Sequence, residues 1–141
     1  GGFGDNVDTR EAQAALEGLF GSDKRTQVEW QVAGHSLPKG AVKMLLNLAM
    51  IAGDALLRGG TLLVASEVHN GATEVVVRAE GPRVLLDEQL RSALTGGVTL
   101  EELTPRAASA YLVHMLAEEA GVGVNIMEEE GVLVFGVTLP G

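Results

Sequence analysis

The chain has 141 residues, of which 46% are hydrophobic and only 4% aromatic, so we expect one domain with an aliphatic core. A formal net charge of −9 argues against nucleic-acid binding, because contacts to phosphates supply most of that affinity. No apolar run reaches the ~20 residues of a membrane span, no secretory signal is visible, and cysteine is absent. A cytoplasmic protein without disulfide or thiolate chemistry is therefore expected.

The first predicted elements are a helix and a strand. Asp8, with Glu11 three residues later, resembles a capping box, and the apolar residues that follow have helical spacing up to Gly21. Apolar and polar residues then alternate over 27–32, which indicates a half-buried strand.

A second, longer helix is predicted to begin at Ser36 and Pro38, a capping hydroxyl and a proline suited to the first turn. It runs to about Leu57 and ends at Gly59-Gly60. Because this helix is apolar on nearly every side, other elements must cover it on more than one face.

The second half of the chain predicts two hairpins with helices between them. Asn70-Gly71, between apolar runs, is a strong hairpin signal. The expected elements are strands over 61–68 and 73–79, a short helix over 87–94, a helix from Thr104-Pro105 to Gly121, and closing strands over 122–127 and 132–139. This order predicts an α+β fold, a two-layer α/β sandwich with helices on one face of a mixed sheet.

Three segments resemble the ATP-binding domain of bacterial sensor histidine kinases, which has the Bergerat (GHKL-type) fold. Leu45-Leu46-Asn47-Leu48 is similar to the helix of the kinase N-box. Gly59-Gly60-Thr61-Leu62 is similar to the strand after it, and Val75-Val76-Val77 to the strand that leads to the first glycine box. The resemblance covers most of the chain.

The nucleotide-binding positions of that family are altered here. Ile51 stands where the family has a magnesium-holding asparagine, and Ala79 where it has the aspartate that bonds adenine. The glycine box keeps Gly81 but has Arg83 in place of its second glycine, and 108–110 lacks the later Gly-x-Gly. The resemblance thus implies a degenerate pocket, with no nucleotide cofactor and no intrinsic ATPase or kinase activity.

A narrower resemblance is to the ChpT-type histidine phosphotransferases of alphaproteobacteria. It rests on the run from Pro38 to Leu48, on Arg58-Gly59-Gly60, on Gly81-Pro82-Arg83, and on Tyr111 with 116–121. Members of that family usually have a proline before the Arg-Gly-Gly, where this chain has leucine.

That family implies a phosphorelay role. In it, a helical-hairpin dimerisation domain carries the phosphoacceptor histidine ahead of the degenerate ATPase-like domain. The implied partners are response-regulator receiver domains, a hybrid histidine kinase, and a second copy of the full-length protein. Phe3-Gly4 resembles the tail of the hairpin. We expect residues 1–7 to be its remnant, or to be left by cloning, and 8–141 to be the degenerate domain, with the phosphoacceptor outside the sequence shown.

The histidines of this chain have ordinary interpretations. His35 and His69 are expected to be solvated loop residues. His114 lies in a predicted helix but is followed by Met115 rather than by the acidic neighbour that a phosphoacceptor usually has. No two histidines have the i, i+4 spacing of a helical metal site, so no metal is expected.

Two questions stay open at this level. Arg83, with Arg78, either presents positive charge to an acidic receiver surface or is a solvated turn residue. Asn47 is either bonded to nearby backbone or a remnant of the N-box. The alternatives to a phosphorelay component are a divergent nucleotide-binding kinase or ATPase domain, with Asp54 and Glu80 as its candidate ligands, and a scaffold without phosphoryl chemistry.

Overall fold

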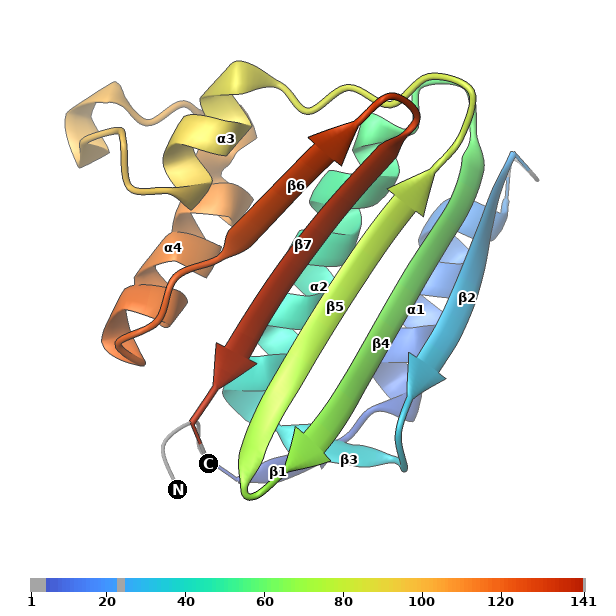
Figure 1. Cartoon of the computed structure of the whole chain (residues 1–141), viewed down its shortest axis with the longest axis vertical. Helices are drawn as coiled ribbons and strands as arrows, with labels where there is room; N and C mark the ends of the chain where they lie inside the picture. Colours follow the sequence, from blue (N-terminus) through green and yellow to red (C-terminus); the bar gives the residue numbers. More distant parts are fainter. Residues whose placement is uncertain (1–4, 23–24, 141) are drawn as a thin grey trace.

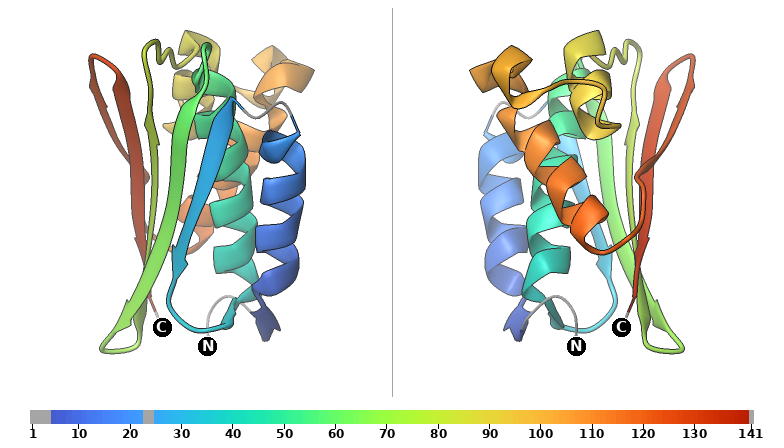
Figure 2. Two further views of the ribbon diagram at one scale, coloured as in Figure 1. Left: turned by 90° about the vertical axis from the view of Figure 1, so that its right-hand side faces the viewer. Right: turned by 90° about the vertical axis from the view of Figure 1, so that its left-hand side faces the viewer.

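A computed structural model describes residues 5–22 and 25–140. It forms a five-stranded mixed sheet with helices against one face, which confirms the predicted two-layer sandwich (Figures 1 and 2). The elements are β1 (Asn6–Asp8), α1 (Arg10–Gly21), β2 (Thr26–Val32), β3 (Ser36–Pro38), α2 (Lys39–Ala55), β4 (Gly60–His69), β5 (Ala72–Glu80), α3 (Glu88–Leu94), α4 (Ala108–Glu119), β6 (Asn125–Glu129) and β7 (Val132–Leu139), with 3-10 turns at Leu100–Glu102 and Pro105–Ala107.

The sheet has the order β2-β4-β5-β7-β6, in which β2 is parallel to β4 and every other neighbouring pair is antiparallel. Asn70 and Gly71 join β4 to β5 with φ angles of 52° and 83°. Positive φ at both central residues is the geometry that an Asn-Gly hairpin turn adopts, so this prediction is confirmed.

The start of α1 differs from the prediction. The carboxylate of Asp8 accepts a hydrogen bond from the backbone N–H of Arg10 at 2.8 Å and bonds its guanidinium, so the expected capping box with Glu11 does not form. These bonds to Arg10 lower the pKa of Asp8 to about 2. Asp8 belongs instead to β1, which pairs antiparallel with β3 in a separate two-stranded sheet.

This small sheet also changes the roles of two predicted segments. Ser36 lies in β3 and does not cap α2, which begins after Pro38. Residues 6 and 7, expected to precede the domain, pair with Pro38 and Leu37. The expectation for residues 1–4 lies outside the described residues.

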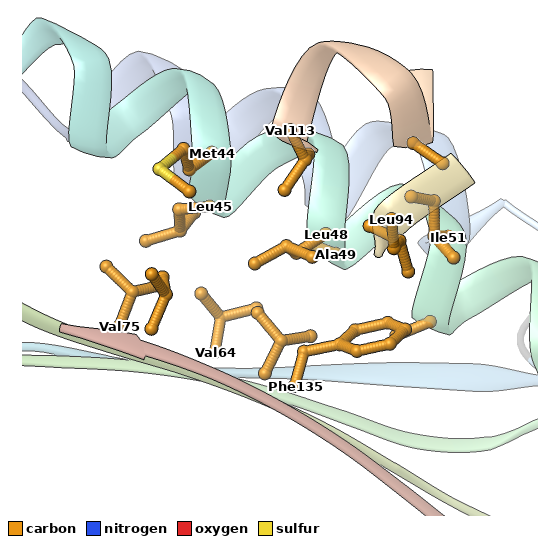
Figure 3. Packing of buried hydrophobic residues seen from close by; sticks show 14 of the residues in the cluster. Met44, Leu45, Leu48, Ala49, Ile51, Val64, Val75, Leu94, Val113 and Phe135 are labelled. Atoms are coloured by element: carbon orange, nitrogen blue, oxygen red, sulfur yellow. The ribbon is translucent and has the colours of Figure 1, made fainter. Parts of the chain in front are cut away.

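The core lies between α2 and the sheet. Leu45 and Leu48 point from α2 toward Val75 and Val64 on the strands (Figure 3). Both α1 and α4 contact the remaining sides of α2, so it is covered on more than one face as predicted.

Polar and aromatic residues near the core are accommodated simply. Asn47 donates from Nδ2 to the carbonyl oxygen of Lys43 at 2.7 Å, which confirms its interpretation as a group bonded to nearby backbone. Trp30 is half-buried on β2 and packs against the core.

The last helix and hairpin are shorter than expected. Residues 105–107 form a 3-10 turn before α4, and β6 begins at Asn125 rather than at 122. Glu128 of β6 pairs with Arg91 of α3.

Candidate functional site

The positions that match the kinase nucleotide pocket lie around the C-terminal end of α2 and the end of β5. Ile51 is 3% exposed and Ala79 is fully buried. Gly81 and Arg83 follow β5 on the segment that leads to α3. We call these four residues the pocket region.

Hydrocarbon occupies the interior beside Ile51. Figure 3 shows Leu94 of α3 next to Ile51, with Phe135 of β7 beneath them. Leu86 and Leu90, which precede Leu94, are also buried in the same cluster. An adenine-binding carboxylate at position 79 would therefore lie among aliphatic groups that cannot bond it.

The segment after β5 is tied to the end of α2 by backbone hydrogen bonds. Leu57 N–H donates to the carbonyl of Arg83 at 3.1 Å, and Leu85 N–H donates to the carbonyl of Ala55 at 3.0 Å. Leu56 and Val84, between them, form an isolated antiparallel bridge. The backbone groups of this segment are thus paired within the protein rather than directed toward a ligand.

Near the C-terminal end of α2, glycines allow backbone segments to pass very close to one another. Gly59 and Gly60 have φ angles of 77° and 140°, which favour glycine. A Cβ atom would collide with the carbonyl of Arg25 at Gly59, with that of Glu80 at Gly60, and with that of Gly59 at Gly81. The start of β2, the loop before β4 and the end of β5 therefore approach one another too closely for any side chain.

The outer surface at this end combines positive charge with apolar groups. Arg25, Arg58 and Arg83 are exposed, as are Leu57 at 44% and Leu85 at 56%. Their backbones are adjacent, since Arg25 Nη2 donates to the Leu57 carbonyl at 3.1 Å and Leu57 bonds Arg83. We call these five residues the arginine end.

Arg78 lies on a different surface from Arg83. It occupies the uncovered face of the sheet and donates from Nη2 to Glu80 at 2.5 Å. Asp54 belongs to α2 on the opposite side of the sheet, so Asp54 and Glu80 are not brought together.

Asp54 has its own electrostatic environment in the helical layer. Burial raises the pKa of its carboxyl, and the charge of Arg106 acts in the opposite direction. Arg106 also lies 3.6 Å from Asp87, the residue that caps α3. These charges lie on α2, at the start of α3 and in the turn before α4.

The histidines do not gather into a site. His35 is exposed, and His69, at the end of β4 rather than in a loop, lies 2.6 Å from Glu67. His114 is half-buried, 3.2 Å from Glu118, with its ring against Gly96. Within residues 5–22 and 25–140, no group of three or more potential ligands could hold a metal ion.

The family model described as the histidine phosphotransferase C-terminal domain matches residues 9–131. The chain belongs to this family. It is 30% identical over 135 residues to the protein phosphotransferase ChpT of Brucella abortus (strain 2308), an alignment that covers 96% of this chain. A solved bacterial phosphotransferase superposes with a TM-score of 0.81 at 28% identity over 94% of this chain.

These relatives are longer than the histidine phosphotransferase domain described here. The chain spans 64% of the length of each of the two phosphotransferases. None of the helices in the described ranges is both long enough and apolar enough to cross a membrane.

Histidine kinases share the fold at lower identity. The Acinetobacter baumannii kinase AdeS superposes with a TM-score of 0.66 at 14% identity, covering 96% of this chain and 66% of its own. The kinase-like fold predicted from the sequence is therefore confirmed, as is the resemblance to ChpT-type histidine phosphotransferases.

Proposed function

We propose that this domain is part of a cytoplasmic, dimeric histidine phosphotransferase and docks receiver domains without binding ATP. The observation that carries the proposal is a pocket region filled by hydrocarbon and bridged by backbone bonds, in a member of the histidine phosphotransferase family. The phosphoacceptor histidine would lie on an upstream helical hairpin. The donor would be a hybrid histidine kinase acting through its receiver.

The arginine end is the surface on which we place receiver docking. Its guanidinium groups suit an acidic receiver surface, and the neighbouring Leu57 and Leu85 add apolar area that a partner can bury. The proposal assigns receiver docking to Arg83 but not to Arg78, because Arg78 is paired with Glu80 on the open face of the sheet.

Phosphotransfer by the full-length protein tests the docking surface. We expect Arg58→Glu and Arg83→Glu to slow transfer from a phosphorylated receiver at least tenfold at subsaturating receiver. Lys43→Glu reverses the charge of another exposed residue, on α2 away from this end, and serves as the matched control. Transfer rates that fall equally in all three variants would contradict the assignment, since they would report net charge alone.

Titration of the chain with ATP and magnesium tests the closed pocket. Because the interior beside Ile51 is aliphatic, we expect no heat of binding and no thermal shift. Binding at micromolar concentration would refute this part of the proposal.

A further inference from the structure

The sheet has an apolar surface on the face that the helices leave open. Figure 1 looks onto this face, and the side views in Figure 2 show the helices only on the other side. Alternation along each strand turns one set of residues toward the core and the other outward. The outward residues at its centre, which we call the apolar strip, are Leu63, Ala65, Val76, Val134, Gly136 and Met127.

The strip crosses four strands, and Arg78 interrupts it between Leu63 and Val134. Ala65 of β4 lies opposite Val76 of β5, and Val76 lies opposite Gly136 of β7. One step along β7, Val134 lies opposite Met127 of β6, which is 46% exposed. At about 4.8 Å between strands the strip is ~15 Å wide. A helix of about ten residues has that length.

Carboxylates surround the strip. Glu29, Glu67, Glu74 and Glu129 are all exposed at outward positions of their strands. Arg78, the one lysine or arginine among the outward strand positions in the described ranges, lies inside the strip and is paired with Glu80. His69, also at an outward position, lies 2.6 Å from Glu67. The rim is therefore negative, and it suits a partner whose apolar groups are flanked by lysine or arginine.

The same charges disfavour two other occupants. A second copy placed face to face would bring its own carboxylates against these, in a chain of net charge −9. An anionic membrane surface would be repelled in the same way.

Gly136 points to close approach by another molecule. Its φ is not in the left-handed region, and a Cβ built there meets nothing within 4 Å. The fold therefore does not require glycine at this position, and glycine weakens a strand interior. It lies between Val76 and Asn125 in the register, so its missing side chain leaves a depression at the edge of the strip, beside Val76.

We propose that the apolar strip binds an amphipathic helix of a partner protein, with basic residues along the edges of its apolar stripe. The helix lies across Gly136, where the missing side chain admits its closest residues, and its basic groups face the carboxylate rim. This surface is separate from the arginine end, so the protein can hold this helix and a receiver domain at the same time.

A pair of designed peptides tests the chemistry. The first is a 14-residue helix with a leucine and alanine stripe flanked by lysines, and the second replaces those lysines with glutamates. Fluorescence anisotropy with the 141-residue chain should show the lysine peptide binding at least tenfold more tightly, with affinity that falls as salt rises. Amide shifts on binding should map to the strip. Equal affinities, or shifts confined to the helical layer, would overturn the proposal.

Gly136→Val supplies the decisive variant. We expect it to unfold at the same or a higher urea concentration than the parent chain, because a β-branched residue suits the strand, and to bind the lysine peptide at least tenfold more weakly. Gly18→Val, an open position on the exposed side of α1, should leave the affinity unchanged. Unchanged affinity in Gly136→Val would refute the proposal. Self-association or vesicle binding that Gly136→Val abolishes would also refute it, because the occupant would then be a second copy or a membrane.

Discussion

Restoring the lost aspartate, by Ala79→Asp, should destabilise the domain strongly rather than recover ATP binding. Ala79 is fully buried on β5 and faces the aliphatic cluster. A buried carboxyl without a partner costs about 1–3 kcal/mol even when neutral. Burial also raises its folded-state pKa well above the unfolded value of about 3.9, by as much as ~3–5 units.

The pH dependence of this loss has a definite sign. Because the folded-state pKa is raised, the folded state binds more protons than the unfolded state at pH values between the two pKa values. The free energy of unfolding therefore falls as pH rises above about 4. At ~1.4 kcal/mol per pH unit, the added loss between pH 4 and pH 7 is about 4 kcal/mol. Near pH 4 the variant should lose only the cost of the neutral group.

Urea unfolding from pH 4 to pH 8, relative to the parent chain, measures both quantities. Ala79→Asn has a similar size but no ionisation, so its loss should not depend on pH. Ala65→Asp makes the same change on the open face of β4, where water reaches the carboxylate, and should cost ~1 kcal/mol or less. If Ala79→Asp loses under ~1 kcal/mol at pH 7 with no pH slope, the pocket region is hydrated and our interpretation is wrong.

Three further predictions concern single contacts. Gly60→Ala should lower the free energy of unfolding by several kcal/mol in urea, because its φ of 140° and a facing carbonyl leave no room for a Cβ atom. At Gly18 an added Cβ meets nothing within 4 Å, so Gly18→Ala should stabilise α1 by about 0.5–1 kcal/mol. In an NMR titration Asp8 should have a pKa of about 2, and Arg10→Gln should return this pKa toward 3.8. Because the pKa of Asp8 is lower in the folded state, the stabilisation by this pair is present above about pH 4 and is lost as pH falls toward 2. Leu94→Ala should lower the unfolding free energy by about 2–5 kcal/mol, because it opens a cavity beside α2, and a smaller loss by urea unfolding would mean that the site is loosely filled.

The larger elements could be predicted because each has a strong local signal. The observed structure contains the three elements that were predicted from these signals: α2 from its apolar residues, the hairpin from Asn-Gly at 70–71, and β2 from its alternation. The β1–β3 pair could not be predicted, because three-residue strands are too short to show a period. Its absence from the prediction also explains the error at Asp8 and Ser36, which were interpreted as helix caps.

The candidate site was predictable in composition but not in geometry. The sequence places an apolar residue at Ile51 and Ala79, and the structure buries both. The bridge between Leu56 and Val84 depends on two loops meeting in space, for which the sequence has no local signal. Arg78 and Arg83 are close in the chain, yet the alternation of β5 and the loop after it direct them to different surfaces.

The backbone crossing at Gly59, Gly60 and Gly81 has a consequence for the kinetics of recognition. It joins the loops that carry Arg25, Arg58 and Arg83 through hydrogen bonds and contacts too close for side chains. If receivers dock here as proposed, they meet a backbone that is already held in place, so little backbone conformational entropy is lost on association. Encounter should then be limited by diffusion and electrostatic steering rather than by a loop that must first close.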